Sequence, residues 1–331
     1  MKFAPVIYLI GMLLCILSLF MLVPAIVDWF YGSNDWPAFI ASSLVTVFFG
    51  GACYLSARGS ATEHLELRQA FLLTNSAWLS IALFGSLPFL FSEINMSFVD
   101  AIFESTSGIT TTGSTVIVNL EQTSHGILIW RALLQWLGGV GIIVMALAIL
   151  PMLSIGGMQL FKTESYETPD KVVPKAAGFA KGISIVYITL TIAWAVMLWG
   201  AGMPVFDSIA HAMTTIATGG YSTKSSSLAA FNSSSIELII IFGMIVGSLP
   251  FVHYLSISKN GWKNLIKDDQ VKLFLTLVIF VIFIISIYLS LQNIPYLEAL
   301  RLASFNVVSI ITGTGFGTSD FNSWGGFATT L

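Results

Sequence analysis

The chain has 331 residues, of which 56% are apolar and only 9% are charged, and its formal net charge is -3. A soluble domain contains roughly 25% charged residues, so this composition cannot cover a surface that faces water. It excludes a soluble enzyme, a disordered chain and a nucleic-acid binder, and it indicates a polytopic membrane protein. The two cysteines, Cys15 and Cys53, lie inside apolar runs, which indicates small buried side chains and excludes a disulfide framework.

A helix that spans a membrane needs about 20 mostly apolar residues. The sequence contains several runs of this length, and because open sheets cannot face lipid, all should be α-helices. The first run is too long for a signal peptide, and no small-residue cleavage site follows it. The runs are 5–27, 37–57, 70–91, 127–153, 182–200, 236–257 and 271–291.

Lysine and arginine are unevenly distributed between these runs. Eleven of them lie on the side of the N-terminus and three on the opposite side. Because basic residues concentrate in cytoplasmic loops, the N-terminus and the loops 58–69, 154–181 and 258–272 are predicted to be cytoplasmic. The loop 258–272 either contacts a regulatory subunit or simply carries this charge. The acidic outer side either attracts cations or only reflects the depletion of basic residues.

Three of the outward connections are too long and too apolar to be ordinary loops. Each begins with a short helix-like stretch and then passes through a Thr-Gly pair followed by a small residue. The pairs are Thr112-Gly113, Thr218-Gly219 and Thr312-Gly313, and their glycines are spaced by 106 and then 94 residues. This recurrence predicts an internal repeat of span, pore helix, Thr-Gly turn and span.

The predicted unit crosses the membrane twice, so successive units have the same orientation. They should pack as parallel repeats around an axis along the membrane normal, because inverted repeats need an odd number of spans. Irregular backbone at membrane depth must be buried by protein or line a water-filled cavity. Several such turns around one axis would form a ring of carbonyl oxygens that replaces the hydration shell of a monovalent cation. Glycine lets the backbone approach the axis, and the C-terminal ends of the short helices favour a cation.

At these residues the sequence resembles the Trk/Ktr/HKT superfamily of potassium transport proteins. It is most similar to the Trk branch, because two spans precede the first repeat. The resemblance covers essentially the whole chain. The motifs that carry it are DAIFESTSGITTTGSTV at 100–116, QWLGGVGI at 135–142, ATGGYST at 217–223 and FNVVSIITGTGFGTSDF at 305–321.

The resemblance implies an all-α polytopic membrane protein with parallel span–pore helix–span repeats around a central pore. It places two accessory spans at 1–67, repeat 1 at 68–160, repeat 2 at 178–257 and an incomplete repeat 3 at 270–331. This arrangement contains about seven spans and three pore helices. The fourth repeat and the gating loop of the third are expected to be absent. The chain is therefore expected to be a fragment or a truncated product, and the function inferred is that of the complete family protein.

The resemblance further implies potassium uptake across the bacterial inner membrane by the pore-forming subunit of a Trk-type system, not an enzyme. Potassium is the substrate, no covalent cofactor is expected, and backbone carbonyls form the selectivity filter. In sodium-permeable plant relatives a filter glycine is replaced by serine. None of the three glycines is replaced here, which favours potassium over sodium. The implied partners are membrane lipid, a second copy of the chain and a cytosolic nucleotide-binding regulatory subunit, with no nucleic acid. The predicted potassium-binding residues are Thr111, Thr112, Gly113, Ala217, Thr218, Gly219, Ile311, Thr312 and Gly313.

Two other functions remain as alternatives. A proton- or sodium-coupled potassium symporter would need a carboxylate embedded in the membrane, and the sequence offers no obvious candidate deep in a span. An intramembrane enzyme would need a metal or nucleophile cluster, and the four histidines form no metal-spacing motif. The run 137–141 is not a nucleotide loop, because no strand precedes it; its small residues indicate close helix packing. The histidines are His64, His125, His211 and His253.

Four polar residues near the repeats admit more than one interpretation. Glu104 and His211 lie on pore helices and either attract cations, support the filter by hydrogen bonds, or are only satisfied polar groups behind it. Arg131, at the outer end of a span, is expected to pair with an interfacial carboxylate or to snorkel rather than to gate. Arg301 lies on the third pore helix, where a neighbouring carboxylate is a plausible partner that the sequence does not identify.

Overall fold

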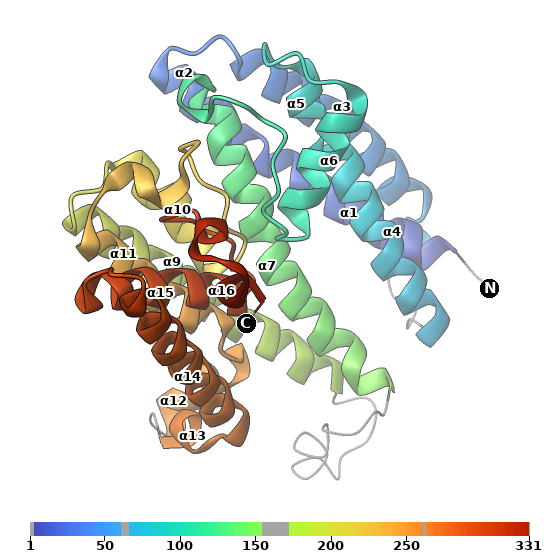
Figure 1. Cartoon of the computed structure of the whole chain (residues 1–331). Helices are drawn as coiled ribbons and strands as arrows, with labels where there is room; N and C mark the ends of the chain where they lie inside the picture. Colours follow the sequence, from blue (N-terminus) through green and yellow to red (C-terminus); the bar gives the residue numbers. More distant parts are fainter. Residues whose placement is uncertain (1–2, 61–65, 154–171, 261–262, 331) are drawn as a thin grey trace. The chain divides into compact units, whose positions relative to one another are not determined.

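The computed structural model describes residues 3–60, 66–153, 172–260 and 263–330. In these residues every regular element is a helix, and no strand is present (Figure 1). The prediction of an all-α protein is therefore confirmed for the described part of the chain. Much of the predicted loop 154–181 lies outside the described residues, as does His64.

The chain folds into two compact units. The first groups the predicted accessory spans with predicted repeat 1, and the second groups predicted repeats 2 and 3. Because Thr111–Gly113 belongs to the second unit, the three predicted filter segments all fall in that unit. The first unit comprises Met1–Thr110, Ser114–Ile117 and Gln122–Ala180, and the second comprises Thr111–Gly113, Val118–Glu121 and Lys181–Leu331.

The first unit consists mainly of long apolar helices. Pro5 and Pro37 lie in the first turns of two of them, where the missing backbone N–H would have no helical partner in any case. Ser97 caps the pore helix α6 by accepting the Asp100 backbone N–H at 3.2 Å. The helices are α1 (Ala4–Phe20), α2 (Leu22–Tyr31), α3 (Trp36–Ser56), η1 (Arg58–Ser60), α4 (Leu67–Gly85), α5 (Leu87–Phe91), α6 (Phe98–Ile109) and α7 (His125–Leu153), with η2 (Leu120–Gln122) before α7.

The largest part of the second unit begins at Lys181 in α9 and contains the other two predicted pore helices, α10 and α15. Asp268 caps α14 by accepting the backbone N–H groups of Gln270 and Val271, which satisfies donors that the first helical turn leaves free. The helices are α9 (Val172–Gly200), α10 (Val205–Ile216), η4 (Ser227–Phe231), α11 (Ser234–Ser248), α12 (Phe251–Asn260), α13 (Lys263–Lys267), α14 (Asp269–Leu291), α15 (Tyr296–Ile311), η5 (Phe321–Trp324) and α16 (Gly326–Thr330).

The core of the second unit gathers apolar side chains from five helices. Leu198, Ala212, Met244, Val278 and Phe305 are buried together there, one each from α9, α10, α11, α14 and α15. The helices α14 and α15 lie side by side in Figure 1 and share a further apolar cluster. Because lipid tails are as apolar as these side chains, close packing rather than transfer from water must hold such helices together. This core positions both pore helices of the unit.

Five helical stretches are long and apolar enough to cross a membrane, judged by length and composition among the described residues. They correspond to the predicted runs 5–27, 37–57, 70–91, 182–200 and 271–291. The stretches are Ala4–Tyr31, Trp36–Ser56, Arg68–Phe91, Ala180–Gly200 and Asp269–Leu291.

The two remaining predicted runs differ from this pattern. The run 127–153 lies in α7, a helix of 29 residues, part of whose side chains are outside the described set. The run 236–257 is not one helix: α11 ends at Ser248, and α12 begins at Phe251. Pro250 separates them, since proline has no backbone N–H to continue a helix.

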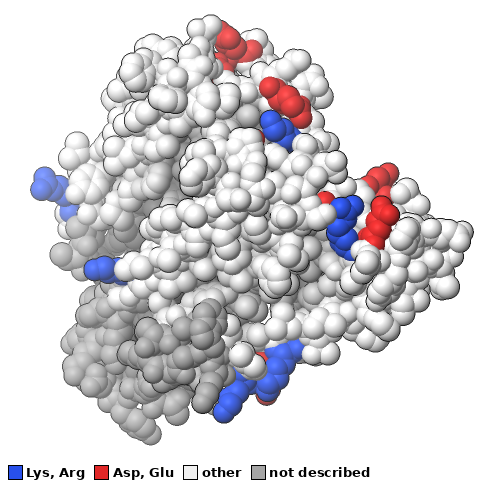
Figure 2. All heavy atoms as spheres, turned by 90° about the vertical axis from the view of Figure 1, so that its left-hand side faces the viewer, with Lys and Arg blue, Asp and Glu red and all other residues white. Residues whose placement is uncertain are grey.

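The surface has few charged side chains, as expected for a protein surrounded by lipid. Figure 2 shows a face on which charged side chains occur only in a few separate places and most atoms belong to uncharged residues. Large apolar side chains project outward from the long helices, for example Leu273, Phe280 and Phe283 on α14. Such a surface is unfavourable in water and suited to lipid.

Candidate functional site

Each of the three predicted pore helices ends at a residue after which the chain leaves helical geometry. The C-cap residues are Thr110 after α6, Ala217 after α10 and Thr312 after α15. Of the predicted filter residues, Ala217 and Thr312 are thus helix C-caps, and Ile311 is the last residue of α15. The predicted order of a short helix followed by a turn therefore occurs three times in the structure.

The backbone after each C-cap follows one pattern. The first and third residues after the cap have left-handed φ angles, whereas the second does not. Three of these six residues are the glycines of the third position, and a fourth is Gly313 at the first position. The φ angles are 56° at Thr111 and 83° at Gly113, 50° at Thr218 and 75° at Gly220, and 73° at Gly313 and 84° at Gly315.

Two of the left-handed residues, Thr111 and Thr218, are β-branched, and β-branched residues are genuine outliers in this region. The left-handed conformation costs each about 1–2 kcal/mol. Strain of this kind persists only where the surrounding structure enforces it, and it concentrates at functional sites. The two threonines therefore mark the ends of α6 and α10 as positions where backbone shape outweighs local preference.

This backbone register differs from the alignment of Thr-Gly pairs in the sequence. Gly113 is the third residue after its C-cap, Gly219 is the second, and Gly313 is the first. The glycines that share the third, left-handed position are Gly113, Gly220 and Gly315. Sequence reasoning missed the last two, although the pairs Gly219-Gly220 and Gly313-Thr314-Gly315 contained the signal.

The structure brings the second and third segments together within the second unit. A Cβ atom at Gly220 would overlap the Thr314 carbonyl oxygen and would lie 2.8 Å from its carbonyl carbon. Only a residue without a side chain fits there. The chain beyond the third segment is also held, because the Leu228 backbone N–H donates to the Gly317 carbonyl at 3.1 Å, and the Gly317 N–H donates to Ser227 Oγ at 3.2 Å.

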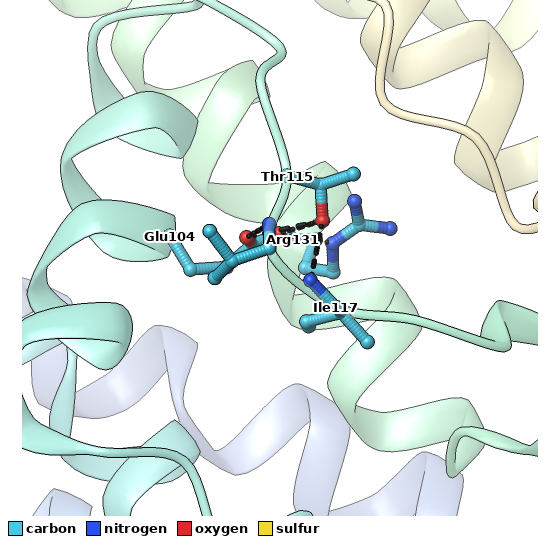
Figure 3. Close-up of polar contacts among 5 residues, drawn as sticks. Glu104, Thr115, Ile117 and Arg131 are labelled. Atoms are coloured by element: carbon cyan, nitrogen blue, oxygen red, sulfur yellow. Dashed lines mark hydrogen bonds and ion pairs between the residues drawn. The ribbon is translucent and has the colours of Figure 1, made fainter.

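The carboxylate of Glu104 on α6 is the centre of a buried polar group that includes the residues following the first predicted filter segment in the chain (Figure 3). It accepts hydrogen bonds from Thr115 Oγ1 at 2.9 and 3.1 Å and from the Val116 backbone N–H at 3.0 Å. Arg131 Nε lies 2.7 Å from Glu104 Oε1, and the two side chains are 2% and 0% exposed. Thr115 Oγ1 in turn accepts the Ile117 N–H at 3.1 Å. Arg131 therefore pairs with a carboxylate, but as a buried residue that does not snorkel.

Behind the second segment, the buried imidazole of His211 has two polar neighbours. Nδ1 lies 2.8 Å from the Asp207 carbonyl oxygen, and Nε2 lies 2.9 Å from Ser222 Oγ. A carbonyl can only accept, so in the neutral ring Nδ1 carries the proton and the Ser222 hydroxyl donates to Nε2. Thr223 Oγ1 donates to Asp207 Oδ1 at 2.6 Å. The helix α10 and the chain after the second predicted filter segment are thereby linked at two points.

Within the run 137–141, Gly138 packs closely, as the sequence predicts, whereas a Cβ atom at Gly141 would meet nothing within 4 Å. A Cβ atom at Gly138 on α7 would overlap the carbonyl oxygen of Ile109, the last residue of α6. The span thus supports the end of the first pore helix by direct backbone contact. Gly247 on α11 lies similarly against Ile216 at the end of α10, with 2.9 Å between its ideal Cβ and the carbonyl oxygen.

Two further polar contacts join elements of the second unit. Arg301 on α15 places Nε 3.7 Å from Glu237 Oε2 and donates from Nη1 to Ser234 Oγ at 3.0 Å, both on α11. Glu121 accepts the Ser225 hydroxyl at 2.6 Å and the Ser225 N–H at 2.8 Å. These hydrogen bonds, the hydroxyl first, lower the pKa of the Glu121 carboxyl below its usual value. Among the described residues, no three His, Cys, Asp or Glu side chains form a group that could hold a metal ion.

Comparisons with known proteins give one consistent result. Residues 36–330 match the family model TrkH, described as a cation transport protein. The Trk system potassium uptake protein TrkI of Halomonas elongata is 37% identical over 329 residues, which are 99% of this chain and 66% of that protein. The Trk system potassium uptake protein TrkH of Vibrio parahaemolyticus is 39% identical over 333 residues, covering 98% of this chain and 68% of that protein.

The fold has a solved counterpart. The crystal structure of the potassium transporter TrkH from Vibrio parahaemolyticus matches with a TM-score of 0.91 at 36% identity, and the match covers 100% of this chain and 69% of that one. The chain therefore spans about two thirds of the length of the relatives it matches.

Proposed function

The chain belongs to the TrkH family of cation transport proteins, and we propose that it forms the larger part of the pore of a potassium uptake system. The family is one of transporters rather than enzymes, and relatives at 37% and 39% identity are potassium uptake proteins. The observation that carries the proposal is the shared backbone pattern after the three pore helices. A binding site for a dehydrated cation needs such irregular backbone, because its carbonyl oxygens replace the water of the ion's hydration shell.

The proposed filter includes all nine residues predicted from the sequence and is extended by the backbone register. We assign Gly220, Thr314 and Gly315 to it because they occupy the second and third positions after their C-caps. Its carbonyl oxygens would bind potassium, with side chains acting only through the shape of the backbone. Glycine at the third position allows the left-handed angle and the close approach that Gly220 makes to Thr314.

The proposed setting is the bacterial inner membrane, with the N-terminus in the cytoplasm as the distribution of basic residues favours. The repeats would surround one central pore, bounded as predicted at 68–160, 178–257 and 270–331. The proposed partners are membrane lipid, a second copy of the chain and a cytosolic nucleotide-binding regulatory subunit. The relatives' description as members of a Trk system supports an assembly of more than one component.

Coupled symport is the second candidate function, and one observation favours it. Asp28 in α2 is fully buried, and its Oδ2 has no hydrogen-bond partner, whereas the other carboxylate oxygen accepts the Gly126 N–H. A buried carboxylate oxygen without a partner is a candidate for reversible protonation, which a proton-coupled symporter requires. The sequence predicts Asp28 to be one of the acidic residues of the outer side, not a carboxylate deep in a span.

The test is rubidium and potassium uptake by proteoliposomes. Two proteins are compared: the 331-residue chain, and the chain extended by the corresponding C-terminal third of Vibrio parahaemolyticus TrkH. We expect the extended chain to take up potassium and to discriminate against sodium. Flux that reverses with the potassium gradient alone indicates a channel-like pore, and flux that requires a proton or sodium gradient indicates symport. An extended chain that is inserted and monodisperse but shows no potassium-selective flux, where the Vibrio protein does, overturns the proposal.

A further inference from the structure

One position in each pore helix holds a buried polar side chain. Glu104, His211 and Asn306 each lie six residues before the C-cap of α6, α10 and α15. All three side chains are buried. Their chemistry differs completely, since one is a carboxylate, one an imidazole and one an amide. A shared position with unlike side chains indicates a shared structural task rather than a shared reaction.

The partners of these side chains are also equivalent. Glu104 binds Thr115 and His211 binds Ser222, in each case a hydroxyl eleven residues later in the chain. That hydroxyl then accepts a backbone N–H two residues further on, from Ile117 in one repeat and from Lys224 in the other. Each hydroxyl lies just beyond a filter segment. The pore helix therefore binds the chain on the far side of its own filter.

In the third repeat, the buried side chain binds different hydroxyl groups. Eleven residues after Asn306 stands Gly317, which has no side chain. The Asn306 amide instead donates to Thr318 Oγ1 at 3.4 Å and to Ser319 Oγ at 3.2 Å, the next two hydroxyls. It also donates to the Leu302 carbonyl at 2.9 Å, one turn back. This last contact matches the one that His211 makes with the carbonyl of Asp207.

We propose that Glu104, His211 and Asn306 are positioning residues that hold the chain beyond each filter segment against its pore helix. This inference rests on the proposed function, because it assumes that the segments are filters. Leaving either partner unbonded in a buried site would cost free energy, so each pair enforces one loop position. The three side chains touch no ion; they act by setting where the backbone carbonyls lie.

The three links differ in strength, and this makes the proposed filter asymmetric. The first link is charge-assisted and has two acceptor oxygens with three bonds of 2.9–3.1 Å. Hydrogen bonds to ionised groups are roughly twice as strong as neutral ones. The third link is neutral and its contacts are 3.2 and 3.4 Å long. The first segment should therefore be the stiffest and the third the most adaptable.

The experiment replaces the link in the second repeat. His211→Leu removes both ring nitrogens, and His211→Gln keeps an amide able to donate to Asp207 and accept from Ser222. The matched control is Thr214→Val, because Thr214 is buried on the same helix but its hydroxyl binds only carbonyls of that helix, at Ala210 and at residue 211. The readouts are the potassium-over-sodium preference of rubidium uptake in the extended chain, and amide hydrogen exchange across 219–225.

We expect H211L to lower the potassium-over-sodium preference about fivefold, the change that corresponds to one hydrogen bond. It should also speed exchange across 219–225, whereas H211Q restores both properties and T214V changes neither. Asn306→Leu should have a smaller effect than H211L, because its contacts are longer. Loss of protein stability without a change in preference would reflect a merely structural role.

The outcomes separate the two proposals. If the unaltered extended chain transports potassium selectively and H211L retains that preference, the inference is wrong and the proposed function stands. If the unaltered chain shows no selective uptake, the proposed function fails, and hydrogen exchange alone decides whether the link exists. Exchange across 219–225 that is the same in H211L and T214V overturns the inference in either case.

Discussion

Removing Arg131 tests the buried ion pair between Glu104 on α6 and Arg131 on α7. The substitution Arg131→Met keeps an unbranched apolar stem but removes the guanidinium group and its charge. It leaves the Glu104 carboxylate in a site where both side chains are at most 2% exposed and where the Nε–Oε1 distance was 2.7 Å. Removing one partner of a buried ion pair costs about 3–5 kcal/mol, since the remaining charge has no compensation.

The double variant Arg131→Met, Glu104→Gln should recover much of this loss. A neutral glutamine still offers one carbonyl oxygen to the Thr115 hydroxyl or the Val116 N–H, which donate to Glu104 in the unaltered protein. No uncompensated charge remains, so the cost falls to the order of one or two ordinary hydrogen bonds, about 1–2 kcal/mol. The two substitutions should therefore be strongly non-additive.

The assay is the fraction of detergent-solubilised protein that stays monodisperse after heating. In a chain of this size, each kcal/mol of lost stability lowers the midpoint temperature of heat-induced aggregation by about 2 °C. R131M should therefore lower this midpoint by on the order of 6–10 °C. Arg301→Met is the matched control, because Arg301 is 40% exposed and lies 3.7 Å from its carboxylate. Because the Arg301 side chain is partly exposed and the contact is long, we expect R301M to lose less stability than R131M.

Two results would refute this reasoning. An R131M midpoint no lower than that of R301M would mean that Glu104 is neutral or solvated without Arg131. A double variant no more stable than R131M would mean that the loss comes from packing around the methionine rather than from the buried charge.

Three further predictions follow from the backbone and loop contacts. Gly220→Ala should abolish selective rubidium uptake while leaving helix content by circular dichroism unchanged, because its φ angle is 75° and a Cβ there would overlap the Thr314 carbonyl oxygen. Gly138→Ala should lower the midpoint of heat-induced aggregation by an amount equal to about 1–3 kcal/mol, since its Cβ would push on the Ile109 carbonyl at the end of α6. The lowered pKa of Glu121 means that its hydrogen-bonded carboxylate stabilises the loop at 118–121 above the usual pKa of glutamate. This stabilisation is lost as the pH falls through the lowered value. Acid should therefore lower the hydrogen-exchange protection across 118–121, measured relative to the intrinsic exchange rate at each pH, in the unaltered protein but not in Glu121→Gln.

The spans were the most predictable part of the fold. Lipid imposes a minimum apolar length on any crossing, so composition and run length located the helices that include Ala4–Tyr31 and Asp269–Leu291. The break between α11 and α12 was missed because apolarity continues through Leu249 and Phe251, even though Pro250 stood in the run. Hydropathy reports the solvent around a segment, and it does not report whether the backbone stays helical.

Recurrence of Thr-Gly placed each of the three segments after a short helix, and the structure has α6, α10 and α15 ending there. That these segments bind potassium stays a prediction. The ion pair of Glu104 with Arg131 could not be predicted, because it joins residues 27 positions apart on two helices. Which side chains meet across such a distance depends on how the helices pack, and periodicity does not determine that.

The backbone register of the predicted filter segments was missed for a related reason. Aligning Gly113, Gly219 and Gly313 assumes that the Thr-Gly pair is the repeated unit. In the structure, the shared φ pattern is set by distance from the C-cap of each predicted pore helix, because helical hydrogen bonding stops there and the φ angles change. Counted this way, the glycine required is the third residue, and Thr111, Thr218 and Gly313 fill the first.

The same reasoning explains why Asn306 escaped notice in the sequence although Glu104 and His211 did not. A carboxylate and an imidazole at membrane depth attract attention as chemical groups, and an amide does not. The three side chains share a position and a type of contact. In each repeat, a buried polar side chain on the proposed pore helix binds a hydroxyl eleven to thirteen residues later, in the chain that follows the proposed filter. Any further repeat of this unit should obey the same rule. A polar residue six before the end of its pore helix, followed at that distance by serine or threonine, would be recognised by position where residue type alone would fail.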